Sequence, residues 1–194
     1  MGKLFYIMGK SASGKDTIYQ RLLRNPEFSL ERLVIYTTRP IRDGELDGRE
    51  YHFVTEEDFQ KLKAEGKIIE DRGYETVYGL WRYFTADNMN LEEKSYLGIG
   101  TLESYEKLKA YYGEEKIRPI YIEVEDGERL KRAIAREETQ EVPKYEEMCR
   151  RFLADAADFS EEKLLDAQIT MRFVNDDLKQ TEENIRDYIL SQND

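Results

Sequence analysis

The chain has 194 residues, a net charge of −11 at pH 7 and one cysteine, Cys149. This length is typical of one domain with its own core, and an intrachain disulfide is excluded. The acidic balance argues against bulk nucleic-acid binding, because phosphate contacts need basic surfaces. The sequence has no apolar run of the ~20 residues that cross a bilayer, and its start does not resemble a signal peptide. We therefore expect a cytoplasmic protein with no nucleic-acid or membrane partner.

Hydrophobic periodicity predicts strands that alternate with helices along the chain. Short runs of β-forming residues predict strands, and apolar residues three and four positions apart predict helices. Thr55 before a group of acids and Gly66 after it mark one helix by its caps. In chain order, the predicted elements are strand 3–8, helix 16–25, strands 33–38 and 50–54, helix 55–66, strands 67–71, 75–80 and 95–100, helix 101–113, strand 118–124, helices 126–138 and 145–159, strand 167–175 and helix 178–192.

The order of these elements predicts one α/β domain, residues 1–194. Strands and helices alternate at both ends of the chain, which favours a parallel sheet with helices on both faces. Residues 39–90 interrupt the alternation with short strands and one helix. We expect a core made of residues 1–38 and 91–194, and an insertion at 39–90 that carries substrate contacts.

The stretch GKSASGKDT, residues 9–17, has the frame of a phosphate-binding loop. It follows a predicted strand and opens a predicted helix, so backbone N–H groups and the helix N-terminus would surround an anion. An ordinary Gly/Ser turn is the alternative, and the strand–loop–helix context favours the nucleotide site. The residues expected around the phosphates are Gly9, Lys10, Ser11, Ala12, Ser13, Gly14, Lys15, Asp16 and Thr17.

Two further groups of basic residues are candidates for phosphate contacts. Arg39 and Arg42 follow a predicted strand, and their forked side chains suit bidentate phosphate binding. Arg132 and Arg136 share a helix face, and Arg151 lies on the next helix. This second group is either a solvated helical hairpin or a lid that folds arginines over the phosphates. The first group, taken alone, is also compatible with a solvated turn.

The chain resembles the guanylate kinases over nearly its whole length. TTRPIRDGELDGREYHFV, residues 37–54, is similar to their nucleotide-acceptor segment, and FVNDDL, residues 173–178, to a closing motif. The resemblance implies an α/β P-loop nucleoside-monophosphate kinase fold. In that fold a parallel sheet is flanked by helices, with a small acceptor-binding insertion and a helical lid at about 132–151. It also implies transfer of the γ-phosphoryl group of Mg²⁺-ATP to GMP.

On the acceptor side, the resemblance assigns roles to five residues. Arg39, Arg42 and Tyr51 would hold the acceptor phosphate, and Tyr78 would assist. Glu70 would accept hydrogen bonds from the guanine N1–H and 2-amino group, a pair of donors that adenine lacks.

On the donor side, the resemblance assigns five more. Lys15, Arg136 and Arg151 would stabilise the moving phosphoryl group. Arg132 would hold ATP phosphates, and Asn175 would lie near the adenine.

Several positions depart from the family pattern. Ile35 and Leu80 replace hydroxyl residues, and Gly98 and Gly100 replace two acids near Mg²⁺ and the acceptor. Asp16 replaces the loop's Ser or Thr, and two interpretations remain open: a helix first-turn acid favoured by the dipole, or a Mg²⁺ ligand in place of the lost acids. The departures leave two alternatives to a GMP kinase: a kinase for another small phosphorylated acceptor, or a catalytically silent binding module. The oligomeric state stays open.

Overall fold

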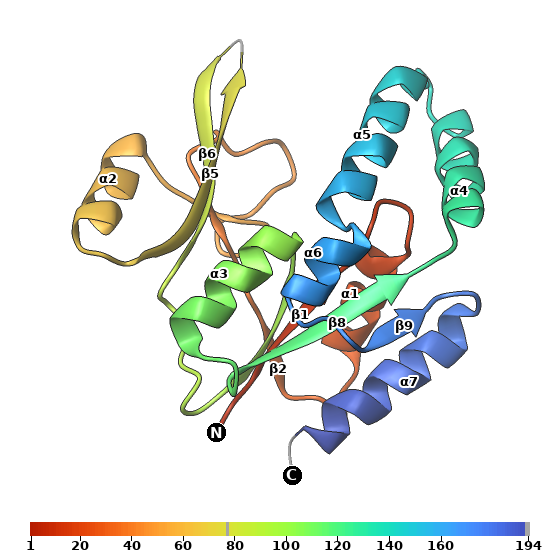
Figure 1. Ribbon diagram of the computed structural model, residues 1–194. Helices are drawn as coiled ribbons and strands as arrows, with labels where there is room; N and C mark the ends of the chain where they lie inside the picture. Colours follow the sequence, from red (N-terminus) through yellow and green to blue (C-terminus); the bar gives the residue numbers. More distant parts are fainter. Residues whose placement is uncertain (77, 193–194) are drawn as a thin grey trace.

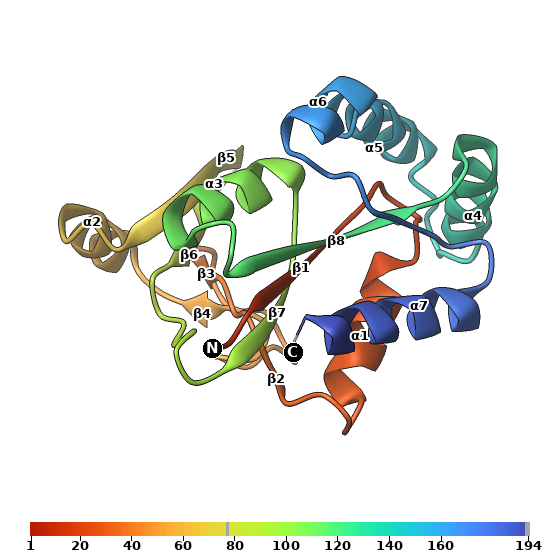
Figure 2. The same cartoon turned by 60° about the horizontal axis from the view of Figure 1, so that its bottom comes forward.

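The computed structural model describes residues 1–76 and 78–192. A parallel sheet with the strand order β2-β7-β1-β8-β9 lies at its centre (Figures 1 and 2). Every neighbouring pair in this sheet is parallel. The strands are β1 (Leu4–Met8), β2 (Leu30–Arg32), β7 (Ser95–Ile99), β8 (Ile117–Glu123) and β9 (Arg172–Val174).

Helices cover both faces of this sheet, which explains why β1 is apolar throughout. Leu4, Tyr6 and Met8 pack with residues of α3 (Leu102–Tyr112) and α6 (Glu161–Asp166). The alternate side chains, Phe5 and Ile7, pack with α1 (Lys15–Arg24) and α7 (Leu178–Ser191) on the other face. The predicted parallel sheet with helices on both faces is therefore confirmed.

A second sheet, with the order β4-β3-β6-β5, stands beside the first. Its strands β5 and β6 form a long antiparallel hairpin that projects from the molecule (Figure 1). Phe59 of the flanking helix packs edge-on against Phe84 and anchors that helix. The elements are β3 (Tyr36–Thr37), β4 (His52–Phe53), α2 (Glu56–Ala64), β5 (Ile68–Thr76) and β6 (Gly79–Ala86).

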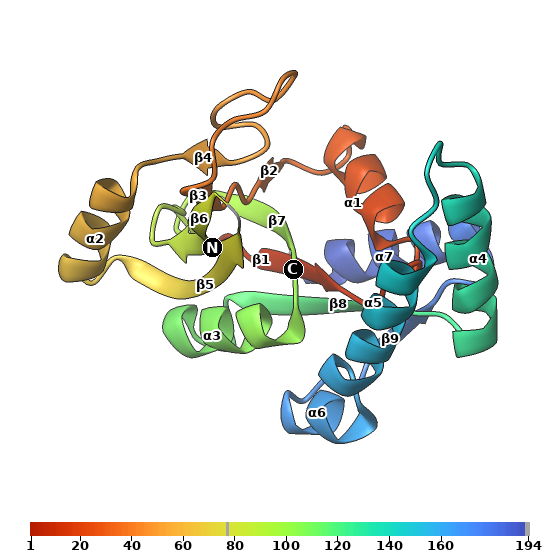
Figure 3. The ribbon, with the colours of Figure 1, turned by 90° about the horizontal axis from the view of Figure 1, so that it is seen from above.

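Two helices, α4 (Asp126–Glu138) and α5 (Tyr145–Asp158), form a pair at the opposite end of the molecule from the second sheet. Figure 3 shows β1 running between these two parts toward the helical pair. Among residues 1–76 and 78–192, no helix combines the length and hydropathy that a bilayer crossing requires.

Several predicted elements were wrong in detail. Within the strand expected at 33–38 only β3 is a strand, and β2 ends just before it in the other sheet, because the chain leaves the central sheet between them. Gly73 was expected to separate two strands but lies inside β5, and the hairpin turns just before Gly79, whose φ of 102° suits glycine. Strand β2, strand β6 beyond residue 80 and helix α6 were not predicted. The strand expected at 167–175 is limited to β9, because α6 ends with its C-cap at Ala167.

Candidate functional site

The loop at residues 9–17 follows the carboxyl end of β1 and turns back toward the sheet before α1 begins. Gly14 has a φ of 86° and forms the N-cap of α1, and Ala12 is also left-handed with a φ of 62°. A left-handed alanine costs on the order of 1 kcal/mol, so the surrounding structure must hold it. Backbone N–H groups in such a turn point inward, together with the helix N-terminus, and form an anion cradle.

Asn175 supports the backbone of this loop through a side-chain hydrogen bond. Its side-chain Nδ2 donates to the Ser13 carbonyl at 2.7 Å, and both residues are buried. A Cβ atom at Gly14 would come within 2.4 Å of the same Nδ2, so only glycine fits there. Arg132 Nη2 in turn donates to the Asn175 carbonyl at 3.1 Å. Asn175 thus supports the loop backbone, and its expected contact with adenine stays a prediction.

Lys15 and Asp16 lie at the start of α1 with different exposures. The Lys15 side chain is 20% exposed, the Asp16 side chain is 84% exposed, and Nζ lies 3.7 Å from Oδ2. In the described part of the chain, no three His, Cys, Asp or Glu side chains are grouped to hold a metal. A cation at Asp16 would therefore take its other ligands from phosphates and water, which is the usual pattern for Mg²⁺.

A buried arginine that the sequence did not single out joins the loop to the helical pair. Arg129 on α4 is fully buried, and its Nη1 donates to the Ser11 carbonyl at 2.9 Å. Asp155 on α5 accepts the Ser11 N–H at 2.7 Å and lies 3.5 Å from Arg129 Nη1. Arg129 also donates to Asp126, whose pKa it lowers, and its guanidinium lies 4.5 Å from the Phe152 ring centre. We call Ser11, Arg129 and Asp155 the loop–lid network.

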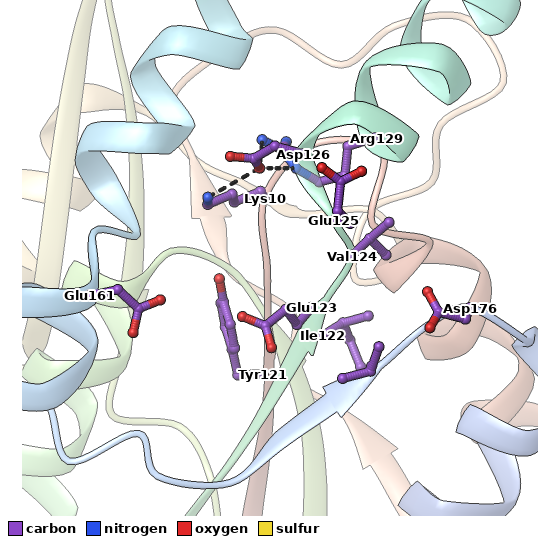
Figure 4. A pocket seen from close by; sticks show the side chains of 11 residues that line it. Lys10, Tyr121, Ile122, Glu123, Val124, Glu125, Asp126, Arg129, Glu161 and Asp176 are labelled. Carbon is purple, nitrogen blue, oxygen red and sulfur yellow. Dashed lines mark hydrogen bonds and ion pairs between the residues drawn. The ribbon is translucent and has the colours of Figure 1, made fainter.

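Figure 4 shows a hollow of about 380 Å³ beside this network, at the carboxyl ends of β8 and β9. Lys10 reaches Asp126 at its upper edge, and Arg129 lies behind them. Most of the charged groups that line the hollow are acidic, and this charge would repel nucleotide phosphates. The acids are Glu123, Glu125, Asp126, Glu161 and Asp176.

The predicted lid arginines lie on α4 and α5, as the sequence indicated. Arg136 and Arg151 both line a cavity of about 200 Å³ between these helices, and Ser11 of the loop borders it. Arg151 Nε donates to Glu147 at 2.7 Å, and Arg150 and Arg151 together lower the pKa of that carboxyl to about 2. The lid arginines therefore face a space that begins at the phosphate loop.

The Arg39 guanidinium, which the sequence suggested for phosphate binding, is already paired with a carboxylate of the chain. It donates to both carboxylate oxygens of Glu45, at 2.8 and 3.0 Å, and the Arg39 side chain is buried. This pairing lowers the pKa of Glu45, which also accepts the backbone N–H of Arg42. The Arg42 side chain is exposed, and the Tyr51 ring lies 5.4 Å from the Arg39 guanidinium carbon. Glu45, missed by the sequence argument, fixes the turn that carries Arg39 and Arg42, which we call the arginine turn.

The two other acceptor candidates lie apart from each other. Tyr78 is 82% exposed at the hairpin tip, where its ring stacks on Trp81. Glu70 is buried near the base of the hairpin, where Oε1 accepts from the Thr85 hydroxyl at 2.8 Å. Arg39 and Tyr51 are thus brought together beside Tyr83 of β6, whereas Tyr78 lies at the hairpin tip.

Tyr6 explains the two glycines that replace acids on β7. A Cβ atom at Gly98 would come within 2.6 Å of the Tyr6 ring, and one at Gly100 within 2.1 Å of its hydroxyl oxygen. Burial, with the nearby Glu70 carboxylate second, raises the pKa of the Tyr6 hydroxyl. A neutral phenol therefore fills the space in which the two acids would otherwise project.

Gly100→Ala is expected to destabilise the protein by about 1–3 kcal/mol, because the new methyl group overpacks against the Tyr6 hydroxyl. Urea unfolding measures the loss. Tyr6→Phe should recover part of it in a double-mutant cycle. The control is Gly127→Ala, which meets only the flexible Glu125 side chain and should not destabilise. A Gly100→Ala protein as stable as the wild type would contradict this packing argument.

A pocket of about 480 Å³ lies between the two sheets and is lined by residues of both. Its walls include the rings of Tyr51, Tyr74, Trp81 and Tyr83, and we call it the aromatic pocket. Its floor reaches Gly100, whose N–H donates to the Ile7 carbonyl. The aromatic pocket therefore opens next to the strand that leads into the phosphate loop.

Comparison with known proteins decides the family of this fold and site. Residues 1–192 match the family model described as guanylate kinase. The chain belongs to the guanylate kinase family. The resemblance to the guanylate kinases is thereby confirmed, and the chain is grouped with the nucleoside-monophosphate kinases. The acceptor role of residues 37–54 stays a prediction.

Relatives cover the chain to different extents. The guanylate kinase of Porphyromonas gingivalis is 29% identical over 191 residues, which are 96% of this chain and 95% of that protein. The guanylate kinase of Schizosaccharomyces pombe is 40% identical over 101 residues, 52% of this chain and 44% of that protein. The crystal structure of guanylate kinase from Anaplasma phagocytophilum matches with a TM-score of 0.64 at 22% identity, covering 98% of this chain and 86% of that one. This structural match confirms the P-loop nucleoside-monophosphate kinase fold.

Proposed function

We propose that this chain transfers the γ-phosphoryl group of ATP to the phosphate of a nucleoside monophosphate, with GMP as the expected acceptor. The position of the aromatic pocket carries the proposal. A planar base suits its aromatic walls, and its floor at Gly100 bonds to Ile7, two residues before the phosphate loop. An acceptor held there would have its phosphate near Tyr51, between the loop and the arginine turn. The guanylate kinase relatives support GMP as the first acceptor to test.

In this proposal, each part of the site has an electrostatic task. The loop N–H groups and the N-terminus of α1 hold the donor phosphates. Lys15, with Arg136 and Arg151 from the helical pair, neutralises the charge that builds up on the transferred group. The exposed side chain of Arg42 is available to the acceptor phosphate. Arg39 already donates hydrogen bonds to Glu45, so it would have to divide its donors between Glu45 and the phosphate.

The donor set at the start of α1 fits a hydrated Mg²⁺. Asp16 offers an exposed carboxylate beside the phosphate cradle, and Mg²⁺ needs only one or two such ligands besides phosphate oxygens and water. When bound, the ion would neutralise phosphate charge. The roles of the chain are then to present the Asp16 carboxylate from a rigid helix start and to keep Lys15 next to it.

Asp16→Ala is expected to raise the Mg²⁺ concentration for half-maximal activity by about 10- to 100-fold, as for other residues that support a metal site. The KM for ATP at saturating Mg²⁺ should change much less. Asp16→Asn should behave like Asp16→Ala, because the charge is what attracts the ion. Glu57→Ala, another exposed first-turn acid, serves as the control. An unchanged Mg²⁺ dependence would reduce Asp16 to a helix-start residue.

An acceptor screen tests the function. ADP formation is measured with ATP and each of several nucleoside monophosphates, and ATP binding is measured separately by calorimetry. Phosphorylation of GMP supports the proposal. ATP binding without phosphorylation of any nucleoside monophosphate would point to another small phosphorylated acceptor. Failure to bind ATP at all would point to a silent binding module.

A further inference from the structure

One face of β5 carries a row of three side chains that leads into the aromatic pocket. Because side chains alternate along a strand, Glu70, Arg72 and Tyr74 share a face. Their cross-strand partners on β6 are Thr85, Tyr83 and Trp81. Three of these six residues are aromatic walls of the pocket, and Arg72 is its charged lining residue.

Within this row, Glu70 lies behind Arg72. The Glu70 side chain is 1% exposed and that of Arg72 is 24% exposed, and Arg72 Nε lies 3.3 Å from Glu70 Oε2. The other Glu70 neighbours are the Thr85 hydroxyl at 2.8 Å and the Ser104 hydroxyl at 3.4 Å. The Glu70 carboxylate thus accepts hydrogen bonds from Thr85 and Ser104, which do not line the aromatic pocket. Arg72 does line the pocket, so it is the charged group that a ligand there would meet.

Arg72 has donors left to offer. Its buried Nε is directed at Glu70 and is not open to a ligand. Its two terminal NH2 groups form no hydrogen bond or ion pair within the described residues, so they are the donors that it can offer to the pocket. The Glu70 charge orients the guanidinium and offsets its cost of burial. Aromatic rings surround the same space, as in sites that stack a planar heterocycle. The charged group that this pocket presents to the edge of the ring is a hydrogen-bond donor, whereas its tyrosine hydroxyls can donate or accept.

We infer that Arg72, held by Glu70, is the residue that determines base specificity, and that it selects purines with an oxo group at C6. This inference rests on the proposed function. An arginine fork donates well to O6 and N7 of guanine, whereas adenine places an amino donor at C6 and opposes it. Glu70 is then a positioning residue, and the 2-amino group of guanine is not read by it.

Two acceptors that differ only in the 2-amino group test directly whether this group contributes to base recognition. GMP and IMP share O6 and N7, so their kcat/KM values should lie within about tenfold of each other. AMP should be a poorer acceptor. Arginine contacts of this kind discriminate between bases by about 5- to 150-fold, so Arg72→Met should lower the GMP/AMP ratio by that factor, mainly through KM.

The variants are designed so that folding does not obscure the result. Arg72→Met leaves Glu70 unpaired, so the double variant E70Q/R72M, which removes both charges, is measured beside it. Lys61→Met on α2 is exposed and serves as the control. Thermal melts check each protein. Glu70→Gln alone should lower GMP and IMP turnover by the same factor, because it acts through Arg72.

The outcomes separate this inference from the function on which it rests. A fall in the GMP/AMP ratio in both Arg72 variants, with GMP and IMP alike in the wild type, supports it. A wild-type preference for GMP over IMP above about 100-fold would assign the reading to Glu70 and overturn it. An unmoved GMP/AMP ratio in an enzyme that phosphorylates GMP would also overturn it and leave the function intact. If the wild type phosphorylates none of the three, the proposed function fails as well.

Discussion

Lys15→Ala is expected to lower kcat by at least about 100-fold, because electrostatic contacts to a transferred phosphoryl group commonly contribute that much or more. Lys15 is the first residue of α1, directly after left-handed Gly14, so its amine stands where donor phosphates meet the helix N-terminus. The side chain is 20% exposed and its only charged neighbour in the described chain is Asp16 at 3.7 Å. Steady-state kinetics of ADP formation measure the effect.

The fold should survive this change, since a solvent-accessible lysine contributes little to stability. Arg24→Ala, at the exposed far end of the same helix, is the matched control and should leave kcat within about twofold. Retention of more than about a tenth of wild-type kcat in Lys15→Ala would contradict the assigned role.

Arg129→Met is expected to destabilise the protein by about 3–5 kcal/mol, because it leaves Asp155 without its buried partner. Arg129 is fully buried and connects α4, α5 and the Ser11 carbonyl. For a domain of this length, the loss corresponds to a fall in Tm of about 6–20 °C. Thermal and urea unfolding measure it. Lys131→Met, two positions along the same helix and exposed, is the control.

The coupling in the loop–lid network is accessible to a double-mutant cycle. Arg129→Met with Asp155→Leu should cost less than the sum of the single changes, because no unpaired charge remains. Arg129→Met as stable as Lys131→Met would show that the buried ion pair does not hold the lid helices. Additive single changes would show that Arg129 and Asp155 act separately.

Local patterns predicted the features that depend on neighbouring residues. The apolar run of β1, the two glycines of the loop and the caps of α2 determine short segments. Thr55 is the expected N-cap, and Asp58 completes a capping box with it. The same patterns predicted the helical pair and the two arginine groups, and the family resemblance added the roles assigned to those arginines. These predictions did not require knowledge of which distant residues meet.

Contacts between distant segments escaped prediction. Glu70 lies two residues from Arg72 in the sequence, but its other partners, Thr85 and Ser104, come from 15 and 34 residues away. The alternation of Glu70, Arg72 and Tyr74 was a signal that could have placed them on one face, and the assumption of a turn at Gly73 hid it. Arg129 gave no signal beyond its spacing from Asp126, because its partners lie 118 and 26 residues away.

The packing of Tyr6 against Gly98 and Gly100 limits the order in which this site can change during evolution. A side chain returns to either glycine position only at a cost in stability while the phenol occupies the space, since the first added carbon would lie 2.6 or 2.1 Å from it. If Tyr6 becomes smaller first, that step alone leaves a cavity in the core. Each path back therefore passes through a less stable intermediate. Tyr6 and the two glycines are thus coupled by epistasis, and lineages that carry Tyr6 are expected to vary metal and acceptor binding elsewhere, at positions such as Asp16 and Arg72.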